Sequence, residues 1–199
     1  MTGQERKVFV SQMTKCALEA SLKKLLLHKP LNKITINDIT EDCGVNRMTF
    51  YYHFQDIYDL VGWSLEKDAA KVLEEHEHYD SLQDAFLTVL QQLRENKTLV
   101  MNLYRSLQRE QIEQYLYKLL DPAMQDFAQQ EGAGLCVPEK DRQFVLDFYK
   151  YALVGTALEW IRGDMKTDPA ELAQRLDVVT HGELYRALAK FSVETPQRS

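Results

Sequence analysis

Apolar residues recur at three- and four-residue steps along most of the chain, with polar residues between them. This spacing places the apolar side chains on one face of an α-helix, and no stretch shows the alternation typical of a half-buried strand. The sequence therefore predicts an all-α protein of about nine helices. We expect these helices at residues 8–28, 35–43, 46–53, 56–78, 81–94, 96–106, 108–130, 139–162 and 169–192.

The first predicted helices begin and end at residues with clear local signals. Val8 and Met13 share an apolar stripe with the leucines that follow, and Pro30 stops this helix. Thr35 with an aspartate three residues later forms a capping-box pattern. Gly44 can adopt the left-handed conformation that ends a helix, and Asn46 can cap the next one.

Residues 34–54 are therefore predicted to form two short helices joined by a tight turn. The buried side is predicted to comprise Ile36, Ile39, Val45, Phe50 and Phe54, and the outward side of the second helix Arg47, Met48, Thr49, Tyr51, Tyr52 and His53. A short, well-supported helix with an exposed cation and hydroxyl groups suits the DNA major groove, which is about 12 Å wide. This pattern favours a helix-turn-helix, although spacing alone also allows a helical hairpin with incidental tyrosines.

Three segments of this region are Ile34-Thr35-Ile36-Asn37-Asp38-Ile39, Gly44-Val45 and Thr49-Phe50-Tyr51-Tyr52-His53-Phe54. In order and spacing they resemble the DNA-binding domain of TetR/AcrR-type transcriptional regulators. The resemblance covers about residues 11–62. It implies an N-terminal three-helix DNA-binding domain at residues 1–55 and a helical-bundle regulatory and dimerisation domain at residues 56–199. Residues 58–63 and 160–165 are also similar to the subgroup related to the activator of dihydroxyacetone-kinase operons.

The resemblance implies a DNA-contacting role for eight residues. Thr35 would anchor a phosphate at a helix N-terminus, and Asn37 and Arg47 would reach base edges. The Arg47 fork matches O6 and N7 of guanine, and Met48 could touch a thymine methyl group. The backbone-positioning residues would be Thr49, Tyr51, Tyr52 and His53. Many relatives have a lysine just after this motif, where the present chain has Gln55-Asp56-Ile57, and Lys24, Lys29 and Lys33 are the candidates to replace it.

The charge distribution fits a nucleic-acid-binding amino end. The chain has a net charge of -6, yet residues 1–55 carry 8 Lys and Arg against 5 Asp and Glu, and residues 56–199 carry 16 against 25. Phosphate binding requires cations only where contact occurs. We therefore expect double-stranded DNA as a partner of the amino end.

Two other classes of function need consideration. Glu75-His76-Glu77-His78 contains one Glu-x-x-His step, half of the di-iron pattern of helical bundles, but no second copy follows or precedes it. Nucleophile, phosphate-loop and zinc-protease strings are likewise missing from the sequence. We therefore predict no catalytic residue, no metal and no cofactor. A helical co-regulator that acts through protein contacts remains an alternative, as does a cofactor-dependent bundle enzyme.

The last two predicted helices have more apolar positions than one core requires. Gly155 and Thr156 would allow another helix to approach closely, and pairing both helices with their copies would form a two-fold interface. The alternative is that these two helices complete the core of a monomer. The predicted dimer residues are Phe148, Ala152, Gly155, Thr156, Leu176, Val179, Leu184 and Leu188. The resemblance also implies a small-molecule effector, or a protein partner, at the C-terminal domain.

The sequence shows no long apolar run that could span a membrane or serve as a signal peptide. Its three cysteines are an odd number without paired spacing, which argues against a disulfide framework. We expect a cytoplasmic protein that does not bind membranes.

Overall fold

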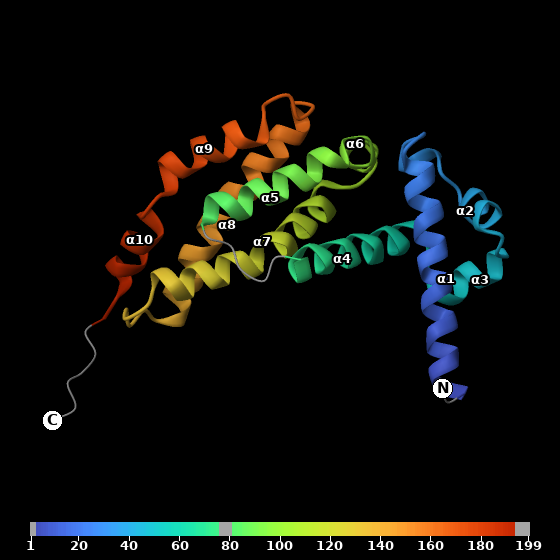
Figure 1. Cartoon of the computed structure of the whole chain (residues 1–199), viewed down its shortest axis with the longest axis horizontal. Coiled ribbons are helices and arrows are strands. Elements are labelled where there is room, and N and C mark those ends of the chain that lie inside the picture. Colours follow the sequence, from blue (N-terminus) through green and yellow to red (C-terminus); the bar gives the residue numbers. More distant parts are fainter. Residues whose placement is uncertain (1–2, 76–80, 194–199) are drawn as a thin grey trace. The chain divides into compact units, whose positions relative to one another are not determined.

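The structure is a computed structural model that describes residues 3–75 and 81–193 (Figure 1). These residues contain ten α-helices, a short 3-10 helix and no strand, which confirms the all-α prediction. The helices are α1 (Gly3–Leu26), η1 (Leu31–Lys33), α2 (Ile36–Cys43), α3 (Arg47–His53), α4 (Ile57–Glu75), α5 (Leu82–Glu95), α6 (Lys97–Tyr104), α7 (Arg109–Glu131), α8 (Glu139–Arg162), α9 (Pro169–Thr180) and α10 (Glu183–Phe191).

The chain forms two compact units, each built from two separate stretches of sequence. The first unit contains Met1–Ala70 and Asn96–Ile112, and the second contains Lys71–Glu95 and Glu113–Ser199. Helix α6 therefore belongs to the first unit and α5 to the second, while α4 continues from one unit into the other. These units are defined by packing, whereas the boundary predicted after residue 55 separates DNA binding from regulation. That functional boundary stays a prediction.

One apolar core holds the first unit together, and α2 and α3 lie against α1 (Figure 1). The predicted burial of Ile39, Phe50 and Phe54 is confirmed. Helix α6 closes the unit, because the side-chain amide of Asn102 donates a hydrogen bond to the carbonyl of Leu26 at 2.7 Å. The buried core residues are Leu18, Leu22, Leu26, Leu31, Ile34, Ile39, Phe50, Phe54, Leu60, Val61 and Leu103.

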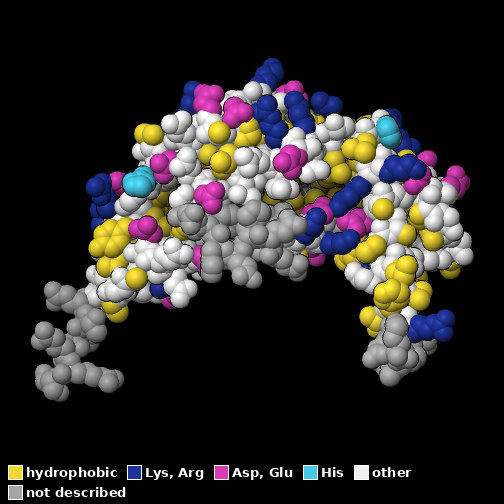
Figure 2. Space-filling view, in the orientation of Figure 1, with side chains coloured by type: hydrophobic (Ala, Val, Ile, Leu, Met, Phe, Trp, Pro, Cys, Tyr) yellow, Lys and Arg dark blue, Asp and Glu magenta, His cyan; other side chains and the backbone are white. Residues whose placement is uncertain are grey.

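The N-terminal part of α1 differs from the prediction. Val8 and Met13 are exposed, as are Phe9 and Val10, whereas Leu18 on the same helix is fully buried. Figure 2 shows hydrophobic side chains (yellow) gathered over this part of α1. The predicted apolar stripe is thus buried only in the later part of α1, and its first turns are left exposed. Periodicity identifies an apolar face but does not tell how far the neighbouring helices extend along it.

In the second unit, α5 packs against α9 and α8 packs against α10. Two donors fix the loop that follows α8. The Arg94 guanidinium and the Trp160 indole Nε1 both donate to the carbonyl oxygen of Thr167, at 3.1 and 2.8 Å respectively. Because Arg94 lies on α5 and Trp160 on α8, these bonds hold the loop at a defined place between two helices of the same unit.

The single helix predicted at residues 169–192 is two helices, which is why the described residues contain ten α-helices rather than about nine. Helix α9 ends at Thr180 and α10 begins at Glu183. Gly182, between them, has a φ of 70°, a left-handed conformation that interrupts the helical hydrogen-bond series. The apolar pattern continues on both sides of this glycine, so the pattern alone did not reveal the break.

Among the described residues, no helix combines the length and the apolar character needed to cross a lipid bilayer. His76, Glu77 and His78 lie outside the described residues.

Candidate nucleic-acid interface

Helix α2 is capped at both ends as the sequence predicts. The Thr35 hydroxyl oxygen accepts the backbone N–H of Asp38 at 3.1 Å, and the Asp38 carboxylate accepts the backbone N–H of Thr35 at 2.7 Å. At the other end, Gly44 has a φ of 71° and its N–H donates to the carbonyl of Thr40, as does the N–H of Val45 at 3.0 Å. These contacts set the turn that leads into α3.

The orientation of α3 is fixed at its start and along its inner face. Asn46 precedes the helix, and its side-chain oxygen accepts the backbone N–H of Thr49 at 2.8 Å. Phe50 is fully buried and Phe54 nearly so, with their rings 5.9 Å apart between centroids. Because Phe50 points into the core, the opposite face of α3 points outward.

Four predicted DNA-contacting residues form two ridges on that outward face. Arg47 and Tyr51 make one ridge, and Met48 and Tyr52 make the other, each pair four residues apart. All four side chains are exposed, Met48 to 76% and Tyr52 to 82%. The arrangement offers a cation, two phenols and a thioether to a partner from one short helix.

The Arg47 and Tyr51 side chains also contact each other. Nη2 of Arg47 donates to the Tyr51 hydroxyl oxygen at 3.0 Å, and the guanidinium carbon lies 5.5 Å from the centroid of the Tyr51 ring. The spacing of four residues on a helix could have indicated this contact from the sequence, although it is not among the predicted features.

Thr49 and His53 are half-buried at the edges of the outward face. The Thr49 hydroxyl donates to the Asn46 side-chain oxygen at 3.1 Å. The His53 ring packs edge-on against Tyr52, with 5.0 Å between centroids. Partial burial lowers the pKa of His53, and the positive charge of Lys15 lowers it further. The neutral imidazole is thus favoured in this structure.

On α2, the two predicted residues differ in what they can offer. Asn37 is exposed. The Thr35 hydroxyl donates to the Asp38 carboxylate at 2.9 Å, so a phosphate would have to compete with that carboxylate for it. The backbone N–H of Thr35, the Lys29 ammonium and the Thr35 hydroxyl together lower the pKa of Asp38 to about 2. This carboxylate therefore occupies the N-terminus of α2 in its charged form.

Two of the three lysines considered as replacement phosphate contacts are already paired. The Lys24 ammonium lies 2.5 Å from the Asp42 carboxylate, and Lys29 lies 3.0 Å from Asp38. Lys33 is exposed and makes no ion pair with any described residue. At the position where relatives carry a lysine, the Asp56 carboxylate accepts backbone N–H groups at the start of α4, at 2.8 and 2.9 Å. Asp56 thus caps α4.

A cluster of charges around the buried Glu19, formed with Lys23, Lys67 and Asp68, joins α1 to α4. The Glu19 carboxylate accepts from Lys23 at 2.8 Å and from Lys67 at 2.5 Å, and Lys23 also donates to Asp68 at 2.7 Å. Burial alone would raise the pKa of Glu19, but the hydrogen bonds from Lys23 and Lys67 outweigh it and the pKa is lowered. No local sequence signal reveals this cluster, because its members lie up to 49 residues apart.

The predicted dimer residues fall into three groups. Phe148, Ala152 and Gly155 on α8 and Val179 on α9 are exposed. Thr156 and Leu176 are half-buried. Leu184 and Leu188 are only 5% and 1% exposed, because α10 packs onto α8 of its own chain. The prediction that these two leucines belong to a surface for a second copy is therefore wrong.

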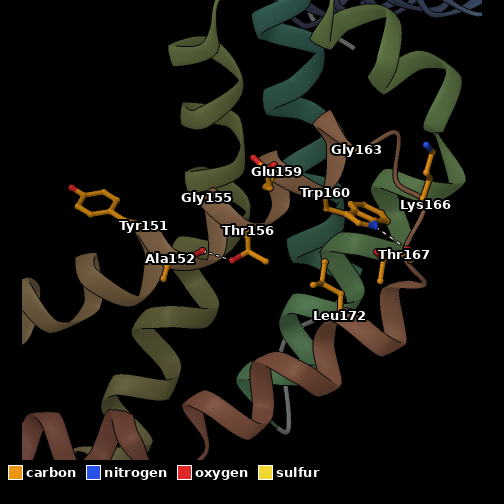
Figure 3. Close-up of a pocket in the computed structure, with 10 residues that line it drawn as sticks. All are labelled: Tyr151, Ala152, Gly155, Thr156, Glu159, Trp160, Gly163, Lys166, Thr167 and Leu172. Carbon is orange, nitrogen blue, oxygen red and sulfur yellow. Dashed lines mark hydrogen bonds between the residues drawn. The ribbon is translucent and has the colours of Figure 1, made fainter.

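Next to the exposed α8 residues lies an open groove of about 660 Å³ within the second unit (Figure 3). Small residues form part of its floor, including Ala152, Gly155 and Gly163. Its polar groups include those of Glu159 and Lys166. Within the described residues, no cluster of His, Cys, Asp and Glu side chains could hold a metal ion.

Family models match both parts of the chain. Residues 19–62 match the bacterial regulatory proteins of the tetR family, and residues 80–182, more than half of the chain, match the C-terminal region of a transcriptional regulator in a TetR-type model. One curated relative is the HTH-type dhaKLM operon transcriptional activator DhaS of Lactococcus lactis. It is 27% identical over 94 residues, which are 47% of this chain and 50% of DhaS. The match thus spans about half the length of that relative.

Solved structures share the fold over most of the chain. One is a dihydroxyacetone kinase operon activator DhaS, with a TM-score of 0.64, 20% identity, and coverage of 90% of this chain and 98% of that one. Another is NalD of Pseudomonas aeruginosa, the secondary repressor of the MexAB-OprM multidrug efflux pump, with a TM-score of 0.59, 20% identity, and coverage of 89% and 96%. With a helix-turn-helix at one end, a helical C-terminal region and matches to both family models, the chain belongs to the TetR family of transcriptional regulators, which are DNA-binding proteins and not enzymes.

Proposed function

We propose that the chain is a sequence-specific regulator that binds a palindromic operator as a homodimer. Residues 1–55 bind DNA, and residues 56–199 dimerise and respond to a small-molecule effector or a protein partner. The observation that carries the proposal is the outward face of α3, where Arg47, Met48, Tyr51 and Tyr52 are exposed opposite the buried Phe50.

The side chains of that face suit two kinds of contact in the major groove, with base edges and with the sugar-phosphate backbone. Arg47 reads guanine through its two parallel donors, and Met48 contacts a thymine methyl group. Asn37 on α2 reaches a base edge. Thr49, Tyr51, Tyr52 and His53 contact the sugar-phosphate backbone, and Thr35 anchors a phosphate at the N-terminus of α2. Such contacts supply affinity and register, whereas the base contacts supply sequence preference.

The exposed face of α8 and α9 supports the homodimer. Phe148 on α8 and Val179 on α9 are 63% and 71% exposed, and Phe144, one turn before Phe148, is 65% exposed. Neighbouring exposed apolar side chains are typical of interaction surfaces. Gly155 lies two turns beyond Phe148 on the same helix face, and a Cβ atom placed on it would meet nothing within 4 Å. A protruding aromatic residue beside a hollow of small residues can form a self-complementary, two-fold contact.

Two copies related by a two-fold axis would present their α3 helices to half-sites about 34–36 Å apart, the distance between successive major grooves. A signal bound by the C-terminal domain would act by favouring one separation of the two helices over another. Such a shift is limited by the difference between the signal's affinities for the two states.

Selection of bound sequences from random double-stranded DNA tests the proposal. We expect an inexact palindrome with half-sites about 10 base pairs apart from centre to centre. Binding should weaken steeply with added salt, because phosphate contacts release counterions. The Arg47→Ala variant should lose about 1–3 kcal/mol of preference at one guanine per half-site. Recovery of no common sequence would contradict the proposal and favour the alternative, a helical co-regulator that acts through protein contacts.

A further inference from the structure

The contact between Arg47 and Tyr51 points beyond the proposal that Arg47 reads a base. We infer that Tyr51 is a specificity-determining residue, which holds the Arg47 guanidinium in the orientation that discriminates guanine from adenine. This inference rests on the proposed function and deepens it.

Tyr51 is itself held by the core. Its ring packs edge-on against the Phe50 ring, with 5.7 Å between centroids and an interplanar angle of 86°. Phe50 is fully buried and packs in turn on Phe54. A continuous row of ring contacts therefore runs from the apolar core to the surface of α3. Tyr51 is 44% exposed, which leaves its ring less free to turn than that of Tyr52 at 82%.

Arg47 meets this support at two points. The guanidinium lies against the Tyr51 ring, 5.5 Å from carbon to centroid, and Nη2 donates to the hydroxyl oxygen at 3.0 Å. An unsupported arginine at the surface samples many rotamers and must lose that freedom when it binds. Since one of its five N–H donors is spent on Tyr51, the fork is oriented before DNA arrives, and four donors remain for the base.

Orientation affects discrimination more than affinity. A guanine offers two acceptors to the fork, whereas adenine offers one acceptor and one donor. A freely turning guanidinium can turn away from adenine and bind a phosphate or water instead. The loss of binding free energy on replacing guanine by adenine is then smaller. A guanidinium held by Tyr51 cannot turn away, so the N–H that faces the adenine amino group stays unpaired.

The test compares two phenol-to-benzene changes on the same helix. The DNA is the sequence selected by the wild-type protein, and a copy in which the guanine read by Arg47 is changed to adenine. The Arg47→Ala variant identifies that guanine, as the one position where its preference disappears. The measured quantity is the ratio of dissociation constants for the two DNAs, with thermal unfolding of each variant recorded beside it.

We expect Tyr51→Phe to reduce that ratio about fivefold, the effect of losing one ordinary solvent-exposed hydrogen bond, with an unchanged unfolding temperature. Among the described residues, the contacts of the Arg47 guanidinium are with Tyr51 and not with the Tyr52 hydroxyl. Tyr52→Phe should therefore weaken binding to both DNAs alike and leave the ratio unchanged. In the Arg47→Ala background, Tyr51→Phe should cause no further loss of preference.

An unchanged ratio for Tyr51→Phe, or equal weakening on both DNAs, would overturn the inference alone and leave Tyr51 as a phosphate contact. An equal fall in the ratio for Tyr52→Phe would overturn it as well. Failure of the wild-type protein to enrich any sequence would overturn the proposed function, and the inference with it.

Discussion

The carboxylate of Glu19 on α1 accepts a hydrogen bond from the ammonium of Lys67 on α4, with 2.5 Å between Oε2 and Nζ. Glu19 is only 4% exposed, so its charge depends on this bond and on the one from Lys23. The pair fastens α4 to the helix that carries the core of the first unit. A movement of α4 relative to α1 would therefore break partly buried charge contacts.

Replacing Glu19 by glutamine should destabilise the protein, because two ammonium groups would lose their negative partner in a partly buried site. We expect a loss of about 1–3 kcal/mol in the free energy of unfolding by urea. The matched control is Glu41→Gln, on the exposed side of α2, where a change within about 0.5 kcal/mol is expected. Equal stability of the two variants would contradict a structural role for the cluster.

Asp38 should make stability depend on pH in the acid range. Its pKa is about 2 in the folded protein, below the value of about 3.9 for an unperturbed aspartate, so the unfolded chain binds this proton more tightly. The stabilisation by the charged carboxylate is thus complete above about pH 4 and is lost as the pH falls toward 2. We expect the difference in unfolding free energy between the wild-type protein and Asp38→Asn to shrink over this interval. A difference that stays constant down to pH 2 would contradict the assigned role.

Two glycines should respond to alanine in opposite directions. Gly44 has a φ of 71°, and a Cβ atom there would meet nothing within 4 Å, so the cost of Gly44→Ala is backbone strain alone, about 1–2 kcal/mol. Gly62 lies within α4 in equally open space, and Gly62→Ala should stabilise the protein by about 0.5–1 kcal/mol through higher helix propensity. Thermal unfolding of both variants measures the contrast, and a stabilising Gly44→Ala would show that the turn does not need its left-handed residue.

Phe148→Glu should convert a dimer into monomers, because a carboxylate would be buried at the centre of the proposed α8 and α9 contact. Sedimentation equilibrium without DNA measures the mass. Leu27→Glu is the control, since Leu27 is 54% exposed and lies in the first unit, and this variant should keep the wild-type mass. A wild-type monomer at micromolar concentration, or a dimer unaffected by Phe148→Glu, would remove this face from the proposal.

The local features of the helix-turn-helix were predictable because they depend on near neighbours in the sequence. Thr35 with Asp38, Gly44, and the pair Phe50 and Phe54 each act within four residues, and the structure confirms all three. Exposure of Arg47 follows from the burial of Phe50 on the opposite side of the same short helix.

Features that depend on distant packing were not predictable. The apolar pattern gave no way to distinguish Leu188, which is buried on α10, from Val179, which is exposed on α9. The burial of Glu19 requires Lys67 on another helix, and its own neighbours in sequence include only one of its partners. The break at Gly182 lies within a continuous apolar pattern, so composition alone did not mark it.

The first unit takes its last core residue, Leu103, from a segment that returns after α5 has been built into the second unit. A chimera that joins the first unit of this protein to another regulator would therefore depend on whether α6 is included. A crossover at residue 70 would leave Leu26 without the Asn102 amide on its carbonyl and would open the core where Leu103 sits. A functional chimera must therefore transfer both segments of the first unit, or use a recipient whose own α6 can replace the missing one.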